Sequence, residues 1–370
     1  MLNNLQQKIK EIHESNFRFV IVSSGGGSNA IASLLKVPGA SNSVLEAYIP
    51  YAKESLDFYL LKQPDFYCSK DTSLRMAAKA YSAAKKIDQG TPTNQLFGIA
   101  ITAALATNYE KKGDHRFHIA LQTEDYSKII SCVMNKGQRS RQEEEELVTA
   151  FVVSLIAESV GLEPCYPDID EQYTAGTVEA REGWRELMRE EIDFITNSGE
   201  TPKLIFPGSF NPIHEGHRKM SSLAEGKINE KTFFEICIQN ADKPPLSYHQ
   251  IESTLKQFDQ SEWLLTKTGK FSDKAKIFPD ATFIIGADTL SRMLDEKFYT
   301  SHKDMIEEFE TFNEQNSRFL VFGRFFQNKF ITLSDLNVPK NIVNRFEGFA
   351  EDIFRDDISS TSIRVAKGED

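Results

Sequence analysis

Short apolar runs alternate with amphipathic segments along the first part of the chain. Residues 17–22, 97–105 and 115–123 have the β-branched and aromatic content of buried strands. Residues 72–87 and 141–160 place their apolar side chains at helical spacing. Strands that alternate with helices predict an α/β layer fold with a parallel or mixed sheet.

A second pattern of the same kind begins at Lys203. Four further strands are expected within residues 203–210, 233–238, 281–288 and 318–324, with helical patterns between them. The first of these strands ends in a turn that carries glycine, serine and histidine. This arrangement is typical of a doubly wound, Rossmann-like fold, in which ligands bind beyond the carboxyl ends of the strands. The predicted fold class is therefore two α/β domains.

The stretch between the two patterns is acidic and poor in aliphatic residues. Trp184, Met188, Ile192 and Ile195 would share one face if this stretch were helical. We therefore predict a connector with one amphipathic helix. The expected division is a first domain at 1–163, the connector at 164–201 and a second domain at 202–370.

Composition narrows the class of protein. The formal charge of −11 argues against a general basic surface for nucleic acid, although a small basic pocket for one mononucleotide remains compatible with it. The four cysteines form no CxxC pair, which favours a reducing compartment over a disulfide framework or a zinc site. The first fifteen residues lack the apolar core of a signal peptide, and residues 150–162 are too short to span a bilayer. We expect a cytoplasmic protein without a membrane partner, and a homo-oligomer is compatible with the sequence.

The segment that follows the first strand of the second pattern, PGSFNPIHEGH at 207–217, carries the most chemistry. Gly208 permits a tight turn and a close approach of backbone to ligand, and Ser209 can donate to a phosphate. His214 and His217 are three residues apart at the start of a helix, so both lie on one face at its positive end. Two imidazoles there suit phosphate chemistry. Such a pair could also bind metal, but no third zinc-type ligand is near in sequence, so no protein-bound metal is expected.

A second segment, ISSTSIR at 358–364, lies near the end of the sequence. Its hydroxyls and backbone amides at a helix start, followed by an arginine one turn later, would form a cradle for an anion. Alone this segment would be interpreted as an ordinary helix cap.

Together the two segments resemble those of the nicotinamide/nicotinate mononucleotide adenylyltransferases, which have a GSFxPxHxGH segment and a later ISSTxIR segment. The resemblance covers about residues 203–370 and includes the intermediate Gly286-Ala287-Asp288. It implies transfer of AMP from ATP, carrying Mg²⁺ on its triphosphate, to a mononucleotide phosphate in NAD biosynthesis, with release of pyrophosphate. It assigns catalysis to His214 and His217. It assigns ATP binding to Gly208, Ser209, Phe210, Asp288, Ser359, Ser360, Thr361 and Arg364.

The same resemblance suggests where the acceptor would bind. Lys243 follows the second strand, where the family often has a phosphate-binding lysine, and a solvated loop lysine is the alternative. Trp263 could stack on a pyridine ring, although its surroundings depart from the family pattern. Relatives of the family use phosphopantetheine or cytidylyl chemistry, so the acceptor stays open. A protein that only senses a nucleotide is the rival from another class.

The first half resembles the CinA-type nicotinamide-nucleotide amidases over about residues 5–163. The resemblance rests on a glycine-rich segment after the first strand, residues 22–29, and on the PG and tyrosine that follow. It places Ser24 on the family's central serine, with Thr102 and Arg139 near its threonine and basic residue. The motif is degraded, so a non-catalytic ligand-binding or scaffold domain, a retained amidase and a different hydrolase stay open. Residues 143–146, four glutamates, are expected to be a solvated helix start.

Overall fold

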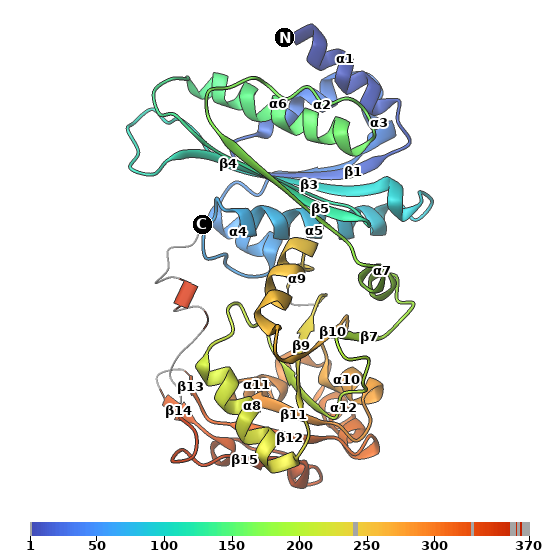
Figure 1. Cartoon of the computed structure of the whole chain (residues 1–370), viewed down its shortest axis with the longest axis vertical. Coiled ribbons are helices and arrows are strands. Elements are labelled where there is room, and N and C mark those ends of the chain that lie inside the picture. Colours follow the sequence, from blue (N-terminus) through green and yellow to red (C-terminus); the bar gives the residue numbers. More distant parts are fainter. Residues whose placement is uncertain (1, 240–242, 327–328, 356–359, 361–362, 365–370) are drawn as a thin grey trace. The chain divides into compact units, whose positions relative to one another are not determined.

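The computed structural model describes residues 2–239, 243–326, 329–355, 360 and 363–364. The chain forms two compact units, each built on its own β-sheet (Figure 1). The first unit comprises residues 2–185 together with 243–252, and the second comprises 186–239 and the described residues from 253 onward. In the described part of the chain, no helix combines the length and the apolar character needed to cross a membrane.

The sheet of the first unit has six strands in the order β2-β1-β3-β4-β5-β6. Strand β1 pairs in parallel with β2 and β3, and the remaining pairs are antiparallel, so the sheet is mixed as the sequence predicted. The strands are β1 (Arg18–Gly25), β2 (Val44–Tyr48), β3 (Leu96–Ala104), β4 (His115–Gln122), β5 (Tyr126–Met134) and β6 (Tyr173–Glu179).

Helices cover both faces of this sheet (Figure 1). One face packs against α1 (Leu2–His13), α2 (Ser28–Lys36), α3 (Ala40–Ser43) and α6 (Arg141–Ser159), and the other against α4 (Lys53–Leu60) and α5 (Lys70–Ile87). The alanine-rich α5 lies very close to β3. A Cβ atom on Gly98 would stand 2.1 Å from the Tyr81 backbone nitrogen, so only glycine permits this approach.

The sheet of the second unit has the order β15-β12-β11-β8-β9-β10-β7. All its neighbouring strands are parallel except β7, which pairs antiparallel with β10 at the edge. The strands are β7 (Phe194–Thr196), β8 (Leu204–Pro207), β9 (Thr232–Cys237), β10 (Glu262–Thr266), β11 (Thr282–Gly286), β12 (Arg318–Phe322) and β15 (Phe346–Gly348), with a separate hairpin of β13 (Arg324–Phe326) and β14 (Lys329–Ile331).

The chain of the second unit reverses its direction of winding between β8 and β11. From β8 the chain moves outward through β9 and β10 and then returns to β11 on the other side of β8. This is the order of a doubly wound Rossmann-type sheet, which confirms the predicted fold class. Its helices are α8 (Glu215–Ile228), α10 (Phe271–Ile277), α11 (Ala287–Met293) and α12 (His302–Glu314). Ligands of such folds bind at the carboxyl ends of the strands where the winding reverses.

The predicted connector contains two strands in addition to a helix. Within residues 164–201, β6 completes the first sheet and β7 completes the second, and α7 (Glu182–Met188) lies between them. The expected helical face is therefore only partly realised, because Ile195 lies in β7 and Ile192 lies beyond the end of α7. Val178 and Glu179, at the start of the stretch that we expected to be helical, pair with β5 instead.

One further segment departs from the expected division at residue 202. Residues 243–252, which lie between β9 and β10 in the sequence, pack within the first unit. They include the start of α9 (Tyr248–Leu255). The Tyr248 hydroxyl donates to the Glu124 carbonyl oxygen at 2.7 Å, and the His249 ring meets the Ser127 hydroxyl at 2.7 Å. Such contacts across more than a hundred residues leave no local pattern in the sequence.

Candidate functional site

A tight loop follows β8 at the point where the winding reverses. The Gly208 amide donates to the Glu235 carbonyl oxygen of the neighbouring strand β9 at 3.0 Å. A Cβ atom on Gly208 would stand 2.5 Å from the Phe210 ring, so glycine is needed for the ring to fold back against the loop. Phe210 has a φ of 41° and is 1% exposed, and its ring packs among Phe206, Phe234 and Phe258. The aromatic core thus fixes the loop, which includes a cis peptide bond before Pro212.

Gln257 holds the same loop from outside the motif. Its side-chain amide nitrogen donates to the Phe210 carbonyl oxygen at 3.0 Å, and its oxygen accepts from the Ile213 amide at 2.9 Å. One side chain therefore fixes both ends of the turn that leads into α8. Sequence reasoning did not find Gln257, because a glutamine some forty residues downstream carries no local signal.

His214 and His217 meet at the start of α8. His214 is the N-cap residue, and its backbone N–H donates to Nδ1 of His217 at 3.3 Å. This bond assigns the ring proton of neutral His217 to Nε2, which can donate to a ligand. The two ring centroids are 3.7 Å apart, and each residue is 9% exposed. The expected shared face at the positive end of the helix is present.

The surroundings of His217 keep its ring neutral. Burial lowers the pKa of His217 to about 3, and the neighbouring His214 and Arg324 side chains add to this effect. Burial disfavours the imidazolium because the charged ring would lose its hydration, and a nearby guanidinium repels it. The ring would therefore meet a ligand as a neutral hydrogen-bond donor, and an incoming phosphate would oppose the effect of Arg324.

Asp288 and Arg324 lie at the carboxyl ends of β11 and β12, beside this loop. The Arg324 Nε atom is 4.0 Å from an Asp288 carboxylate oxygen. Gly286 makes this approach feasible, because a Cβ atom there would stand 2.2 Å from the Asp288 carboxylate and 3.0 Å from Arg324. Arg324 was not predicted. Its signal in the sequence was its position just after a predicted buried strand. That strand, β12, lies next to β11, after which Ala287 and Asp288 follow.

Two residues of the late hydroxyl segment, Ser360 and Arg364, contact the histidine loop. The Ser360 hydroxyl donates to the Pro212 carbonyl oxygen at 2.8 Å, and the Arg364 guanidinium donates to the Asn211 carbonyl oxygen. These contacts join residues about 150 positions apart in the sequence. Ser359 and Thr361, which we also predicted to bind ATP, lie outside the described residues.

A buried ion pair lies behind the glycine turn. Lys274 of α10 pairs with Glu235 of β9, and both side chains are almost fully buried, at 3% and 1% exposed. The Thr266 hydroxyl also donates to Glu235. Because the carbonyl of Glu235 accepts from Gly208, this pair stabilises the strand position from which the loop starts. The residues of the described chain hold no group of three or more His, Cys, Asp or Glu suited to a metal ion.

In the first unit, the glycine-rich loop follows β1, and Ser24 and Thr102 are neighbours in the parallel pairing of β1 and β3. The Ser24 hydroxyl donates to the Pro50 carbonyl oxygen at 3.0 Å, and the Thr102 hydroxyl to the Ser69 carbonyl oxygen at 3.4 Å. A carbonyl oxygen cannot take the proton from a nucleophilic serine. The structure therefore brings two of the three candidate residues together, and among the described residues it shows no base that accepts from the Ser24 hydroxyl.

Arg139, the third candidate, pairs with a different side chain. Its guanidinium makes two bonds to the Glu171 carboxylate, at 2.5 and 3.0 Å. This pairing lowers the pKa of Glu171 to about 2 and raises that of Arg139. The arginine is thus engaged in a bidentate ion pair.

The amides of the glycine-rich loop already hold a carboxylate. The Glu145 carboxylate accepts from the Gly27 amide at 2.9 Å and from the Asn29 amide at 3.5 Å. Both amides lie at the N-terminus of α2, at its N-cap residue Gly27 and in its first turn, where an external phosphate would bind in a nucleotide-binding loop. The anion at these loop amides is therefore the Glu145 carboxylate of the chain itself.

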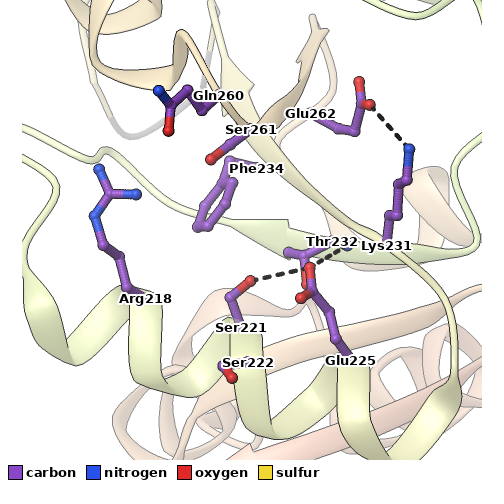
Figure 2. Close-up of a pocket in the computed structure, with 10 residues that line it drawn as sticks. All are labelled: Arg218, Ser221, Ser222, Glu225, Lys231, Thr232, Phe234, Gln260, Ser261 and Glu262. Atoms are coloured by element: carbon purple, nitrogen blue, oxygen red, sulfur yellow. Dashed lines mark hydrogen bonds and ion pairs between the residues drawn. The ribbon is translucent and has the colours of Figure 1, made fainter.

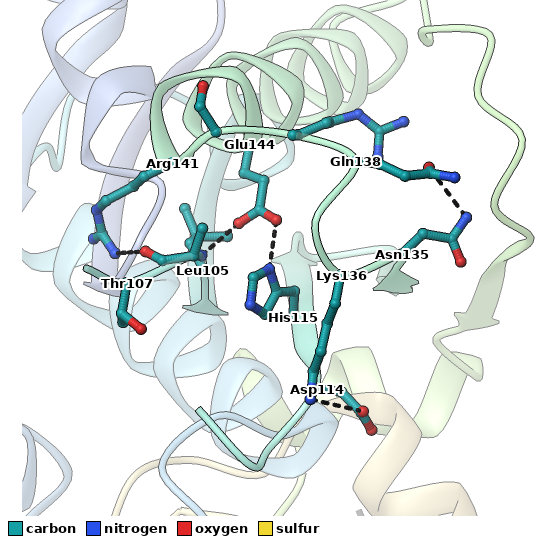
Figure 3. A network of polar contacts seen from close by, with 12 residues as sticks. Leu105, Thr107, Asp114, His115, Asn135, Lys136, Gln138, Arg141 and Glu144 are labelled. Atoms are coloured by element: carbon teal, nitrogen blue, oxygen red, sulfur yellow. Dashed lines mark hydrogen bonds and ion pairs between the residues drawn. The ribbon is translucent and has the colours of Figure 1, made fainter. Parts of the chain in front are cut away.

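The expectation of a solvated helix start at residues 143–146 was wrong for Glu144. This residue is fully buried, and its carboxylate accepts from the Ala106 amide at 2.6 Å and contacts Nδ1 of His115 at 2.6 Å (Figure 3). Glu143 is exposed at the helix start, as expected, and it also completes a capping box, since it accepts from the Ser140 amide at 2.7 Å.

These observations of the second unit agree with a comparison against known protein families. Residues 205–366 match the cytidylyltransferase-like family. The match begins in β8 and includes both histidines, Asp288, Arg324 and the late hydroxyl segment. This part of the chain is thus similar to cytidylyltransferase-like domains.

Solved structures that match this chain include a competence/damage inducible protein and a CinA superfamily protein. The competence/damage inducible protein CihA from Agrobacterium tumefaciens has 14% identity and a TM-score of 0.32, with 43% of this chain and 92% of that chain covered. The CinA superfamily protein from Escherichia coli has 12% identity and a TM-score of 0.30, with 43% and 88% covered. No curated protein matches this chain.

Within the cytidylyltransferase-like domain, the predicted residues fall into two groups. The structure gathers Gly208, His214, His217, Ser360 and Arg364 around one loop, with Asp288 linked to it through Arg324. Ser209 is exposed on that loop, whereas the Phe210 side chain is buried in the aromatic core.

The two predicted acceptor residues are not part of this group. Trp263 is the second residue of β10, three residues before the carboxyl end of the strand, and its backbone amide donates to the Asn197 side chain at 2.9 Å. Lys243 belongs to the segment that packs within the first unit. The acceptor-binding roles of Lys243 and Trp263 therefore stay predictions.

Proposed function

We propose that the second unit transfers AMP from ATP to the phosphate of nicotinamide or nicotinate mononucleotide and releases pyrophosphate. The observation that carries this proposal is the meeting of the late Ser360 and Arg364 side chains with the loop that presents His214 and His217. A protein that only binds a nucleotide would not need both the histidine pair and the Ser360 and Arg364 side chains at one loop. Donors on two sides of one loop suit a reaction in which charge moves along a polyphosphate.

In the proposed step, an oxygen of the acceptor phosphate attacks the α-phosphorus of ATP. A phosphoanhydride bond forms, the bond from the α-phosphorus to the bridging oxygen breaks, and pyrophosphate leaves with that electron pair. No covalent enzyme intermediate is needed, so catalysis consists of positioning and charge stabilisation. ATP enters as its Mg²⁺ complex, with the ion held by the phosphates.

The side chains have distinct roles in this proposal. His217 donates through Nε2, and as a neutral ring it can strengthen its bond to the phosphate as negative charge grows in the transition state. Arg324 and Arg364 supply positive charge on either side of the loop, and the α8 N-terminus adds the helix dipole. Asp288 contacts the ATP ribose, with Arg324 fixing its carboxylate.

The proposal is tested by measuring pyrophosphate release with ATP or CTP as donor and three acceptors in turn: nicotinamide mononucleotide, nicotinate mononucleotide and phosphopantetheine. We expect release with ATP and a pyridine mononucleotide, together with the dinucleotide as product by mass. Release only with CTP or only with phosphopantetheine would identify a different transferase. No release with any pair would leave the sensor alternative.

For the first unit we propose a non-catalytic role. The Ser24 hydroxyl donates to a carbonyl, and Glu145 occupies the loop amides to which a substrate phosphate would bind. A dianionic phosphate would have to displace a carboxylate that accepts two backbone bonds. Ammonia release from nicotinamide mononucleotide is the test. Release that disappears in Ser24→Ala would show that the amidase alternative is right.

A further inference from the structure

The second unit has a cavity away from the histidine loop, between α8 and the first residues of β9 and β10 (Figure 2). Its volume is about 320 Å³, near the lower end for small-molecule sites. Thr232 and Glu262, the first residues of their strands, line it. Because the transferase site uses the carboxyl ends of the strands, this cavity is a separate place on the same sheet.

Two side chains in the cavity have unused hydrogen-bonding capacity. Thr232 is 2% exposed, and its hydroxyl has no partner among the described residues. A buried hydroxyl without a hydrogen-bond partner is destabilising, so such groups normally have a partner. Arg218 extends from α8 beside the cavity, and its guanidinium makes no ion pair or hydrogen bond with the described residues (Figure 2).

The acidic side chains of the cavity, by contrast, already have donors. Glu225 accepts from the Thr232 amide at 2.9 Å and from the Ser221 hydroxyl at 3.4 Å. Glu262 pairs with Lys231 at 3.7 Å (Figure 2). Among the described residues that line this cavity, Arg218 is therefore the charged side chain whose charged group has neither an ion pair nor a hydrogen bond, whereas Glu225 has two neutral donors. The remaining oxygen lone pairs of the carboxylates can still accept from hydroxyl groups.

We propose that this cavity binds a sugar monophosphate. The Arg218 guanidinium would bind the phosphate through its fork of N–H donors. The carboxylates and the Thr232 hydroxyl would bind the sugar hydroxyls, and the Phe234 ring would pack against the apolar face of the sugar. Phosphate alone would leave Thr232 and the acidic end unused, and a neutral sugar would leave Arg218 unused.

Phe234, which lines the cavity, also belongs to the aromatic core beneath the histidine loop. The Phe234 ring centroid is 5.3 Å from that of Phe210, which is 5.1 Å from that of His217. Arg218 also follows His217 directly in α8. The binding claim does not depend on the proposed transferase activity, and the two can fail independently.

The test is a calorimetric titration of the full chain with glucose 6-phosphate, compared with glucose and with inorganic phosphate. Three variants accompany it. Arg218→Gln removes the free charge. Thr232→Val removes the hydroxyl while keeping the shape of the side chain. Lys219→Gln is the matched control, because Lys219 is exposed on the same helix and does not line the cavity.

We expect glucose 6-phosphate to bind with a Kd of about 1 mM or below. Arg218→Gln should weaken binding by about tenfold, Thr232→Val by about threefold, and Lys219→Gln should leave it unchanged. Thr232→Val should also leave thermal stability undiminished, because the hydroxyl it removes has no partner within the described chain. Absence of binding, equal binding of inorganic phosphate, or unchanged affinity in Arg218→Gln and Thr232→Val would each overturn the proposal.

Discussion

Acidification should destabilise the second unit through His217. An ordinary histidine has a pKa of about 6.5, so at pH 5 an unfolded chain holds this proton about 97% of the time. In the folded state the pKa of about 3 leaves the ring about 1% protonated at the same pH. The unfolded state therefore binds more protons below pH 6.5, and stability falls as the pH falls.

The size of this effect follows from the same two pKa values. Linkage over one titrating group gives a loss in the free energy of unfolding of about 2 kcal/mol between pH 7 and pH 5. The slope approaches about 1.4 kcal/mol per pH unit and levels off below about pH 3. His217→Gln removes the titrating ring and keeps a polar side chain, so this contribution should disappear.

Urea denaturation at pH 7 and at pH 5 measures this loss in the free energy of unfolding. Trp184→Phe in every protein leaves Trp263 as the fluorescent reporter, which lies in the second unit. The pH-dependent loss in the parent should exceed that in His217→Gln by about 2 kcal/mol. His302→Gln is the control, because His302 is exposed on α12. Equal losses in the parent and in His217→Gln would refute the reasoning about burial.

Three other predictions follow from the site. His217→Ala should lower turnover by about 10²-fold or more, the effect of losing one transition-state donor, whereas His302→Ala should not; unchanged turnover in a folded His217 variant would make the ring structural. Arg364→Ala should mainly raise the KM for ATP, with the exposed Arg355→Ala as control, and an unaltered KM would contradict the role of Arg364. Lys274→Met should lower the free energy of unfolding by about 3–5 kcal/mol, because it leaves Glu235 buried without its partner, and Glu235→Gln with Lys274→Met should recover much of this loss. A small effect of Lys274→Met alone in urea denaturation would show that Glu235 finds another partner.

The long apolar runs predicted the framework of both sheets well. The expected strands at 97–105 and 115–123 correspond to β3 and β4, and those of the second pattern to β8, β9, β11 and β12. Strand β10 was missed, because EWLLT is short and begins with a charged residue next to polar ones. Strands β6 and β7 were missed because the acidic stretch around them suggested a helix. Both segments are strands because each pairs with the edge of a sheet, and a local sequence pattern does not show such pairing.

The site was predictable only where one segment contains several of its residues. The spacing of His214 and His217 is enough to place both at one helix start, where they lie in the fold. Gln257, Arg324 and Glu145 each act at a loop that is distant in sequence, so only the fold shows their roles. Phe210 illustrates the opposite case: its place within a conspicuous motif suggested ligand contact, and its ring instead supports the loop from the core.

The central claim is that the loop of His214 and His217 transfers an adenylyl group. The most direct measurement is the mass of the product formed from ATP, Mg²⁺ and a pyridine mononucleotide by the full-length protein. The account predicts a dinucleotide in equal amount to the pyrophosphate released, and loss of both in His217→Ala. Pyrophosphate without a dinucleotide, or no turnover with either mononucleotide, would contradict it.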